Sequence, residues 1–181
     1  MKIISNFRVL LLLLWLGAAL FFSFAAAPGA FSVLRAAEVP NYSQLAGSLV
    51  QRNLMIVNFS GMVIGLLLLL TSFANPKSFN RFVLWVERAL IAILIAACAV
   101  GHFVIGLWIS FLRTEIGRST EELALDDPLK LRFDMLHSYS VWILMTAMAA
   151  ALLTFLIIAF KDFSAPAKAV DPLDFTKDFK V

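Results

Sequence analysis

Two histidines, His102 and His137, are the side chains of this sequence best suited to bind a metal or exchange a proton near neutral pH. His102 lies inside an apolar run, where an ionisable side chain indicates a functional site. A neutral imidazole bonded to a neighbouring carbonyl would instead give His102 a structural role, and both interpretations stay open. His137 shares its segment with Arg132 and Ser140, which lie on neighbouring helical turns, so these three side chains could form a polar group facing other helices.

Ligation of one haem or metal ion by both histidines would require them to lie at the same depth in a membrane. Counted back from Lys161, a twenty-residue span leaves His137 about 6 Å outside the hydrocarbon. Counted from Arg88, the span that contains His102 leaves its imidazole about 9 Å inside, so the two rings differ in depth by about 15 Å. We therefore expect no metal site and no cofactor, and a haem- or metal-binding subunit is only a third hypothesis.

Motifs of known enzyme classes are missing from the sequence. It contains no Gly-x-Ser-x-Gly elbow, no phosphate-binding glycine loop, no His-Glu-x-x-His and no Cys-x-x-Cys. The net charge of +3 is spread along the chain, with no basic block that would bind nucleic acid. We expect neither enzymatic activity nor a nucleic-acid partner.

The elements that position these side chains are membrane helices. The chain is 61% hydrophobic and 15% charged, with a mean hydropathy of +0.90, and a soluble domain of this size could not bury so much apolar surface. Four segments, uncharged except for Glu87 and Arg88 at the start of the third, are each long enough to cross about 30 Å of hydrocarbon. We predict an all-α four-helix bundle over residues 1–160 and a flexible cytoplasmic tail over 161–181. The predicted spans are about 9–27, 54–74, 86–112 and 139–160.

The first apolar run could also be a cleavable signal peptide, because Ala25 and Ala27 have the spacing that signal peptidase prefers. Pro28 would follow the cut directly, which is an awkward backbone for the protease, and Trp15 indicates packing against other helices. We therefore expect this run to be retained as a span. Asp127-Pro128 predicts the start of the last helix, with a side-chain cap followed by proline at the first helical position.

Small and polar residues within the apolar runs predict how the helices pack, and charged and aromatic residues at the ends of the runs predict where the helices leave the hydrocarbon. Gly61 and Gly65 have the four-residue spacing that lets helix backbones approach closely in lipid. Asn58, on the same helix, would be satisfied by an interhelical hydrogen bond or a headgroup. Trp85, with Glu87 and Arg88 beside it, predicts an interfacial belt in contact with headgroups. His102 would then be the one ionisable side chain that lies clearly at depth in the membrane.

Four spans place both chain ends on one side of the membrane. Nine of the fifteen lysines and arginines would lie on the side of the termini and six on the other side, which favours cytoplasmic termini. We expect a multi-pass protein of a bacterial inner membrane. Its partners would be the lipid bilayer and either further copies of itself or another membrane protein.

Short motifs of this sequence resemble a known membrane family. They are Trp15-x-Gly17, the Phe-rich run to Phe24, Ala27-Pro28-x-x-Phe31 with Leu34, Ala46-Gly47, and Arg132-x-Phe-Asp-x-Leu-His137-x-x-Ser140. The chain resembles the four-helix membrane family named after transmembrane protein 205, which includes bacterial domains of unknown function. The resemblance covers nearly the whole chain up to about Phe160. It implies a four-helix bundle, and export or tolerance of metals and small toxic solutes is suggested for some members.

Two further hypotheses about function follow from these residues. The first is a non-enzymatic integral membrane protein that supports or assembles a membrane complex. The second is a transporter-like protein that passes a small solute or metal by way of Asn58, His102, Arg132 and His137. Four spans with one deep ionisable side chain make a poor pathway alone, so transport would require self-association.

Overall fold

The computed structural model describes residues 2–73, 81–117 and 119–163, and these residues form helices and short turns with no strand. Four continuous helical stretches of 32 to 36 residues are long and apolar enough to cross a membrane. The predicted all-α fold with four membrane-crossing helices is thus confirmed. At about 1.5 Å per residue each stretch is about 50 Å long, which exceeds the hydrocarbon thickness of about 30 Å.

The first half of the chain forms two of these stretches. The first consists of α1 (Lys2–Phe21), the π-helical turn η1 (Phe22–Ala26) and α2 (Ala27–Ala36). After a short turn, α3 (Tyr42–Phe73) returns along the first stretch. The two stretches contain the predicted spans 9–27 and 54–74, apart from residue 74, which lies outside the described residues.

The second half forms the other two stretches. The third stretch consists of α4 (Arg81–Ala99), the π-helical segment η3 (Val100–Gly106) and α5 (Leu107–Ile116). It ends at Gly117, whose φ of 63° lies in the left-handed region that glycine adopts without strain. A loop with the 3₁₀ turn η4 (Thr120–Glu122) leads to α6 (Pro128–Phe163). The predicted tail therefore begins within α6, and its residues 164–181 lie outside the described part.

The sequence prediction for the start of α6 is confirmed in detail. Pro128 is the first helical residue, and the side chain of Asp127 accepts a hydrogen bond from the amide of Leu129 at 2.8 Å. This cap satisfies one of the amides that a helix start leaves without an intrahelical partner.

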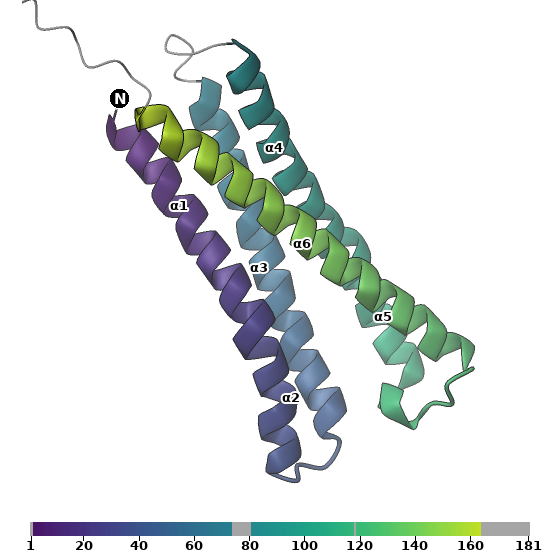
Figure 1. Cartoon of the computed structure of the whole chain (residues 1–181). Coiled ribbons are helices and arrows are strands. Elements are labelled where there is room, and N and C mark those ends of the chain that lie inside the picture. The colour runs from purple at the N-terminus through teal and green to yellow at the C-terminus, as the bar shows by residue number, and fades with distance from the viewer. Residues whose placement is uncertain (1, 74–80, 118, 164–181) are drawn as a thin grey trace, which may run out of the picture.

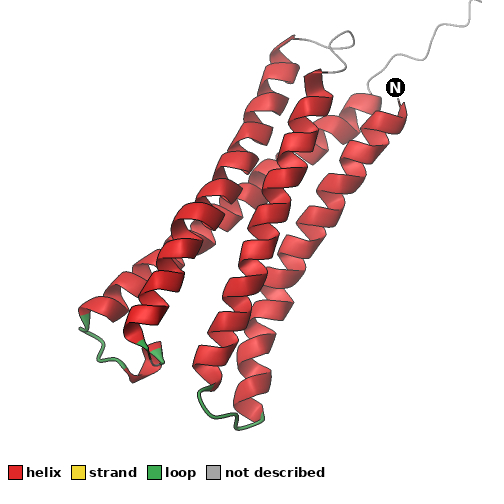
Figure 2. Ribbon diagram, turned by 180° about the vertical axis from the view of Figure 1, so that it is seen from behind, coloured by secondary structure: helices red, strands yellow, loops and turns green. Residues whose placement is uncertain are grey.

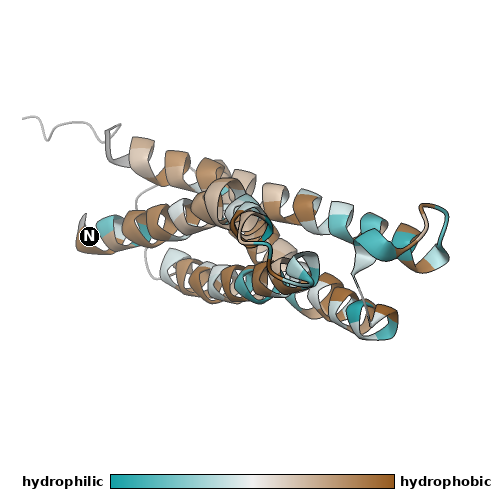
Figure 3. Ribbon diagram, turned by 90° about the horizontal axis from the view of Figure 1, so that it is seen from below, coloured by the Kyte–Doolittle hydropathy of each residue, from teal (hydrophilic) through white to brown (hydrophobic). Residues whose placement is uncertain are grey.

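The helices form a bundle that opens toward one end. Lys2 and the end of α6 lie at the same end, which we call the terminal end (Figure 1). The α2–α3 and α5–α6 connections lie at the opposite end, which we call the loop end. There α2 and α3 form one pair and α5 and α6 another, and the two pairs diverge (Figure 2). Hydrophilic residues gather toward the loop end, whereas apolar residues dominate toward the terminal end (Figure 3).

The terminal half of the bundle is closely packed by side chains from α1, α3, α4 and α6. The fully buried residues of this core include Leu12, Ala19, Leu68, Ile91, Leu94, Cys98, Ala151 and Ile158. Small residues bring the backbones together, because a Cβ at Gly61 would lie 2.6 Å from Cys98 Sγ, and one at Gly65 would lie 2.5 Å from Ile95 Cγ1.

An ion pair is buried in this half and corrects the predicted position of Glu87. The side chain of Glu87 is fully buried rather than at the headgroups. Its Oε1 accepts a hydrogen bond from Arg8 Nη2 at 2.5 Å, and the same nitrogen lies 3.4 Å from the carbonyl oxygen of Leu68. Arg8 therefore connects α1 with both α3 and α4. Arg8 and Glu87 are thus two ionisable side chains buried inside the bundle, which the sequence did not indicate. Such a buried charge is tolerated when it has a partner.

Pro28 accounts for the wide turn at η1. Proline has no amide hydrogen to bond the carbonyl of Phe24, and its ring crowds that carbonyl in a regular α-helix. The chain widens just before it, and the amide of Ala27 bonds the carbonyl of Phe22, five residues back. This turn presents Phe22, Ser23 and Phe24 toward the diverging part of the bundle.

Candidate functional site

A cavity of about 710 Å³ occupies the space where the helix pairs diverge, and we call it the lateral cavity. It is bounded by η1 and α2 on one side, by α3 and α5, and by α6 on the other side. Most of its lining is apolar. Its apolar residues are Leu20, Phe22, Phe24, Ala27, Phe31, Gly47, Val50, Leu54, Ile109, Phe133, Val141, Leu144, Met145 and Met148. Its polar residues are Ser23, Ser43, Gln51, Arg113, Thr120, Glu121, His137 and Ser140.

Arg113 supplies the positive charge of the cavity. Its guanidinium lies against Gly47 of α3, in space that any Cβ at that position would occupy, and lies 5.1 Å from the centre of the Phe133 ring on α6. Within the described part of the chain, no carboxylate lies within 4.0 Å of this guanidinium, and its buried Nε has no hydrogen-bond partner. The contact with Phe133 provides only about 1 kcal/mol of cation–π stabilisation and does not neutralise the charge.

Other polar groups line the same cavity. Ser140 is buried on α6, and His137, one turn before it, is exposed at the cavity with its ring stacked parallel to Phe133 at 6.3 Å. Glu121 of η4 is exposed at the cavity mouth, and its Oε2 accepts a hydrogen bond from the hydroxyl of Tyr42 at 3.1 Å. The cavity thus has an apolar interior and a polar region near Arg113.

The predicted polar group on α6 is brought together only in part. His137 and Ser140 line the same cavity, whereas Arg132 is exposed and does not line it. Asn58 is buried at 2% exposure in the packed half, where its side-chain amide lies against Gly101. It lines neither the lateral cavity nor the groove described next.

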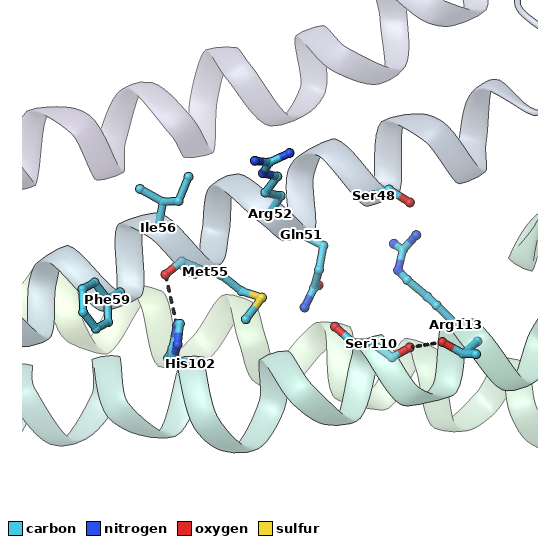
Figure 4. A pocket seen from close by; sticks show the side chains of 10 residues that line it. Ser48, Gln51, Arg52, Met55, Ile56, Phe59, His102, Ser110 and Arg113 are labelled. Carbon is cyan, nitrogen blue, oxygen red and sulfur yellow. Dashed lines mark hydrogen bonds between the residues drawn. The ribbon is translucent and has the colours of Figure 1, made fainter.

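His102 lies on a second, more open concavity, which we call the groove, between α3 and the segment η3–α5 (Figure 4). Its Nδ1 is 3.1 Å from the carbonyl oxygen of Met55, so Nδ1 carries the proton and the Nε2 of a neutral ring carries the lone pair. In the structural role considered for His102, that of a neutral imidazole bonded to a neighbouring carbonyl, the partner would be Met55. The groove is lined by Ser48, Gln51, Arg52, Met55, Ile56, Phe59, His102, Ser110, Arg113 and Thr114.

Gln51 and Arg113 line both the groove and the lateral cavity. The side chain of Gln51 donates a hydrogen bond from Nε2 to the carbonyl oxygen of Gly106 at 2.8 Å. The two side chains therefore form the partition between the two concavities, and the charge of Arg113 is accessible from either side.

The structure gives no support to shared metal ligation by the histidines. His102 lines the groove and His137 lines the lateral cavity. Among the residues described, no three His, Cys, Asp or Glu side chains come close enough together to hold a metal ion.

The remaining motif residues divide between packing and the site. Trp15 is buried and donates from Nε1 to the carbonyl oxygen of Val57 at 3.0 Å. Ala46 is fully buried beside Gly47, and Phe31 lines the lateral cavity. Gly17 is exposed with no atom near its missing side chain.

A model of the domain of unknown function DUF4149 matches residues 10–118, which is more than half of the chain. The chain belongs to this family. The matched residues include Gly47, Gln51 and Arg113 but end before α6. Comparison with curated proteins and with solved structures gives no match.

Sequence reasoning missed Arg113 and Gln51, which this DUF4149 protein places at the centre of both concavities. A lone arginine at a helix end is typical of an interfacial anchor, and only the tertiary structure shows that no described carboxylate reaches it. One signal was present in the sequence. Gly47 was singled out as a motif residue, and its missing side chain is what admits the guanidinium.

Proposed function

We propose that this DUF4149 protein is a non-enzymatic multi-pass membrane protein that binds an amphipathic molecule with a carboxylate or phosphate head in the lateral cavity. The observation that carries the proposal is Arg113, a half-buried guanidinium with no carboxylate partner among the described residues, at the polar end of an apolar cavity. A half-buried charge in such surroundings is costly unless it is paired. An anionic head would supply the pair.

The position of the cavity relative to the predicted spans supports an amphiphile. Leu144, Met145 and Met148 lie within the predicted span 139–160, whereas Phe133 and His137 lie before it. From Phe133 to Met148 the lining extends about 22 Å along α6. A ligand with its head near Arg113 would therefore have its apolar part at the depth of the hydrocarbon.

Transport by a single copy finds no support in the packing. The terminal half of the bundle is filled by the core around Leu68 and Leu94 and by the Arg8–Glu87 pair. A solute in the lateral cavity would have no path through that half without a rearrangement or a second copy. We therefore keep the transporter-like hypothesis secondary to ligand binding.

We further propose a bacterial plasma membrane with cytoplasmic termini, supported by the excess of lysine and arginine on the side of the termini. A relation to the family of transmembrane protein 205 is part of the same proposal. It is supported by the motif from Arg132 to Ser140, which lies beyond the residues matched to DUF4149.

Binding of radiolabelled palmitate to the purified protein in detergent tests the proposed function. Arg113→Gln should weaken binding by about 10- to 100-fold, because a hydrogen bond to a charged group contributes about 1.5–3 kcal/mol. Arg132→Gln is the matched control, since it removes the same charge from an exposed position near the same end of the bundle. Its affinity should equal that of the wild type.

A neutral ligand makes the test specific for the charge. Hexadecanol has the same chain without the carboxylate, so its binding should be the same in the wild type and in Arg113→Gln. Equal palmitate affinity in the wild type and Arg113→Gln would show that the guanidinium does not bind the head, and the proposal would be wrong.

A further inference from the structure

The groove has a different set of charges from the lateral cavity. Its ten lining residues include two arginines, Arg52 from α3 and Arg113 from α5, and no aspartate or glutamate. No carboxylate of the described residues lies within 4.0 Å of either guanidinium. We propose that the groove is a binding site for one anionic phospholipid, whose phosphate is bound by Arg113 together with the exposed Arg52.

The depth of the two arginines matches that of lipid phosphates. Arg52 lies two residues before the predicted span 54–74, and Arg113 lies one residue after the predicted span 86–112. Both guanidinium groups are therefore expected at the edge of the hydrocarbon, where the phosphates of a leaflet are found. Two arginines suit this ligand because guanidinium donors match phosphate oxygens in pairs.

The rest of the groove suits an acyl chain. Met55, Ile56 and Phe59 follow Arg52 along α3 toward the middle of the membrane, and His102 of η3 points toward Met55 (Figure 4). The imidazole is held by the carbonyl of Met55, and its ring is tilted by 46° to that of Phe59, with the two ring centres 5.7 Å apart. A lipid with its phosphate at the arginines would lay a chain along this apolar row.

The hydroxyl groups of the groove do not compete with the arginines for the phosphate. Ser48, Ser110 and Thr114 each donate to a carbonyl oxygen of their own helix, at 2.8 to 3.0 Å. Their oxygens face the groove as acceptors, so they can bind a hydroxyl or ammonium group of a lipid head but not its phosphate oxygens. The arginines are left as the positively charged donors to the phosphate.

Native mass spectrometry of the full-length protein released from detergent tests the proposal with three probes. These are phosphatidylglycerol, diacylglycerol of the same chains, and inorganic phosphate. The wild type should retain one phosphatidylglycerol at least about tenfold more than diacylglycerol, since only the former carries the phosphate. Millimolar inorganic phosphate should not displace it.

Arg52→Gln isolates the groove from the lateral cavity, because Arg52 lines only the groove. Retention of phosphatidylglycerol should fall about fivefold or more, whereas palmitate binding should stay at the wild-type level. Arg35→Gln is the matched control, since Arg35 is an exposed arginine of α2 that lines neither concavity. Its lipid retention should be unchanged.

Three results would each overturn the inference. They are equal retention by Arg52→Gln and the wild type, equal retention of phosphatidylglycerol and diacylglycerol, and displacement of the lipid by inorganic phosphate, which would make free phosphate the ligand. Loss of palmitate binding in Arg113→Gln with normal lipid retention in Arg52→Gln would leave the proposed function intact and reject only the groove.

Discussion

Two glycines, Gly47 and Gly61, each lie closely against side chains of another helix but have different roles, because those side chains differ in stiffness. The missing side chain of Gly47 is replaced by the end of the Arg113 side chain, which has several rotatable bonds. At Gly61 the space is filled by Cys98 and by the indole of Trp15, both held in the packed half. The same substitution should therefore affect binding at one position and stability at the other.

Gly47→Ala is expected to weaken ligand binding while leaving the fold intact. The new Cβ would displace the Arg113 guanidinium from its position over α3, and the flexible side chain can move at little cost. Palmitate affinity should fall about three- to tenfold, less than for complete removal of the charge, because a displaced guanidinium still attracts the carboxylate. The measurement is palmitate binding combined with a thermal-unfolding curve. A normal affinity would mean that the observed position of Arg113 is not the one that binds the head.

Gly61→Ala is expected to lower stability by about 1–3 kcal/mol, as overpacking of a rigid core does. A Cβ there would lie 2.6 Å from Cys98 Sγ and 2.7 Å from Trp15 Cε2, so α1 and α4 would have to move away from α3. Gly17→Ala is the matched control, because nothing lies within 4 Å of its Cβ position. Thermal unfolding in detergent compares the two variants, and equal melting temperatures would contradict the close approach at Gly61.

At the level of elements, the ion pair between Arg8 and Glu87 holds three helices together at the terminal end. Removing one partner leaves a buried charge without its counterion and should cost about 3–5 kcal/mol, whereas replacing both by apolar residues should cost little. We expect Glu87→Leu to lower the melting temperature strongly, and the double variant Arg8→Met with Glu87→Leu to recover most of the loss. A double variant no more stable than Glu87→Leu alone would show that the two side chains act independently.

The number and type of the helices could be predicted from the sequence, but their length and their divergence could not. Uncharged runs of about twenty residues identify crossings directly, and the caps at Asp127 and Pro128 fixed one helix start. The helices continue past the predicted spans because segments such as α2 and the start of α3 pack on each other beyond the uncharged runs. The end of an uncharged run therefore does not mark the end of a helix. The wide turn at η1 follows from Pro28, yet the cavity beside it depends on where α6 lies.

Some site residues could likewise be predicted from the sequence and others could not. His137 and Ser140 were found because they stand on one helix at short spacing. Arg113, Gln51 and Glu121 belong to other elements, and their convergence on one cavity is a property of the tertiary structure. Glu87 was misplaced for a related reason, since a charge next to Trp85 and Arg88 looks interfacial until Arg8 from another helix is seen to reach it.

For the whole molecule, the proposals depend on which side of the membrane the loop end faces. The charge distribution predicts that it faces outward, so an exposed residue of the α5–α6 connection should react with an impermeant maleimide added to intact cells. Leu125, at 84% exposure, is suited to a single cysteine in a Cys98→Ala background. A cysteine in place of Ile3, 84% exposed at the terminal end, is the opposite control and should react only after permeabilisation. The reverse pattern would place both concavities in the inner leaflet, and their amphipathic ligands would then have to come from the cytoplasmic side.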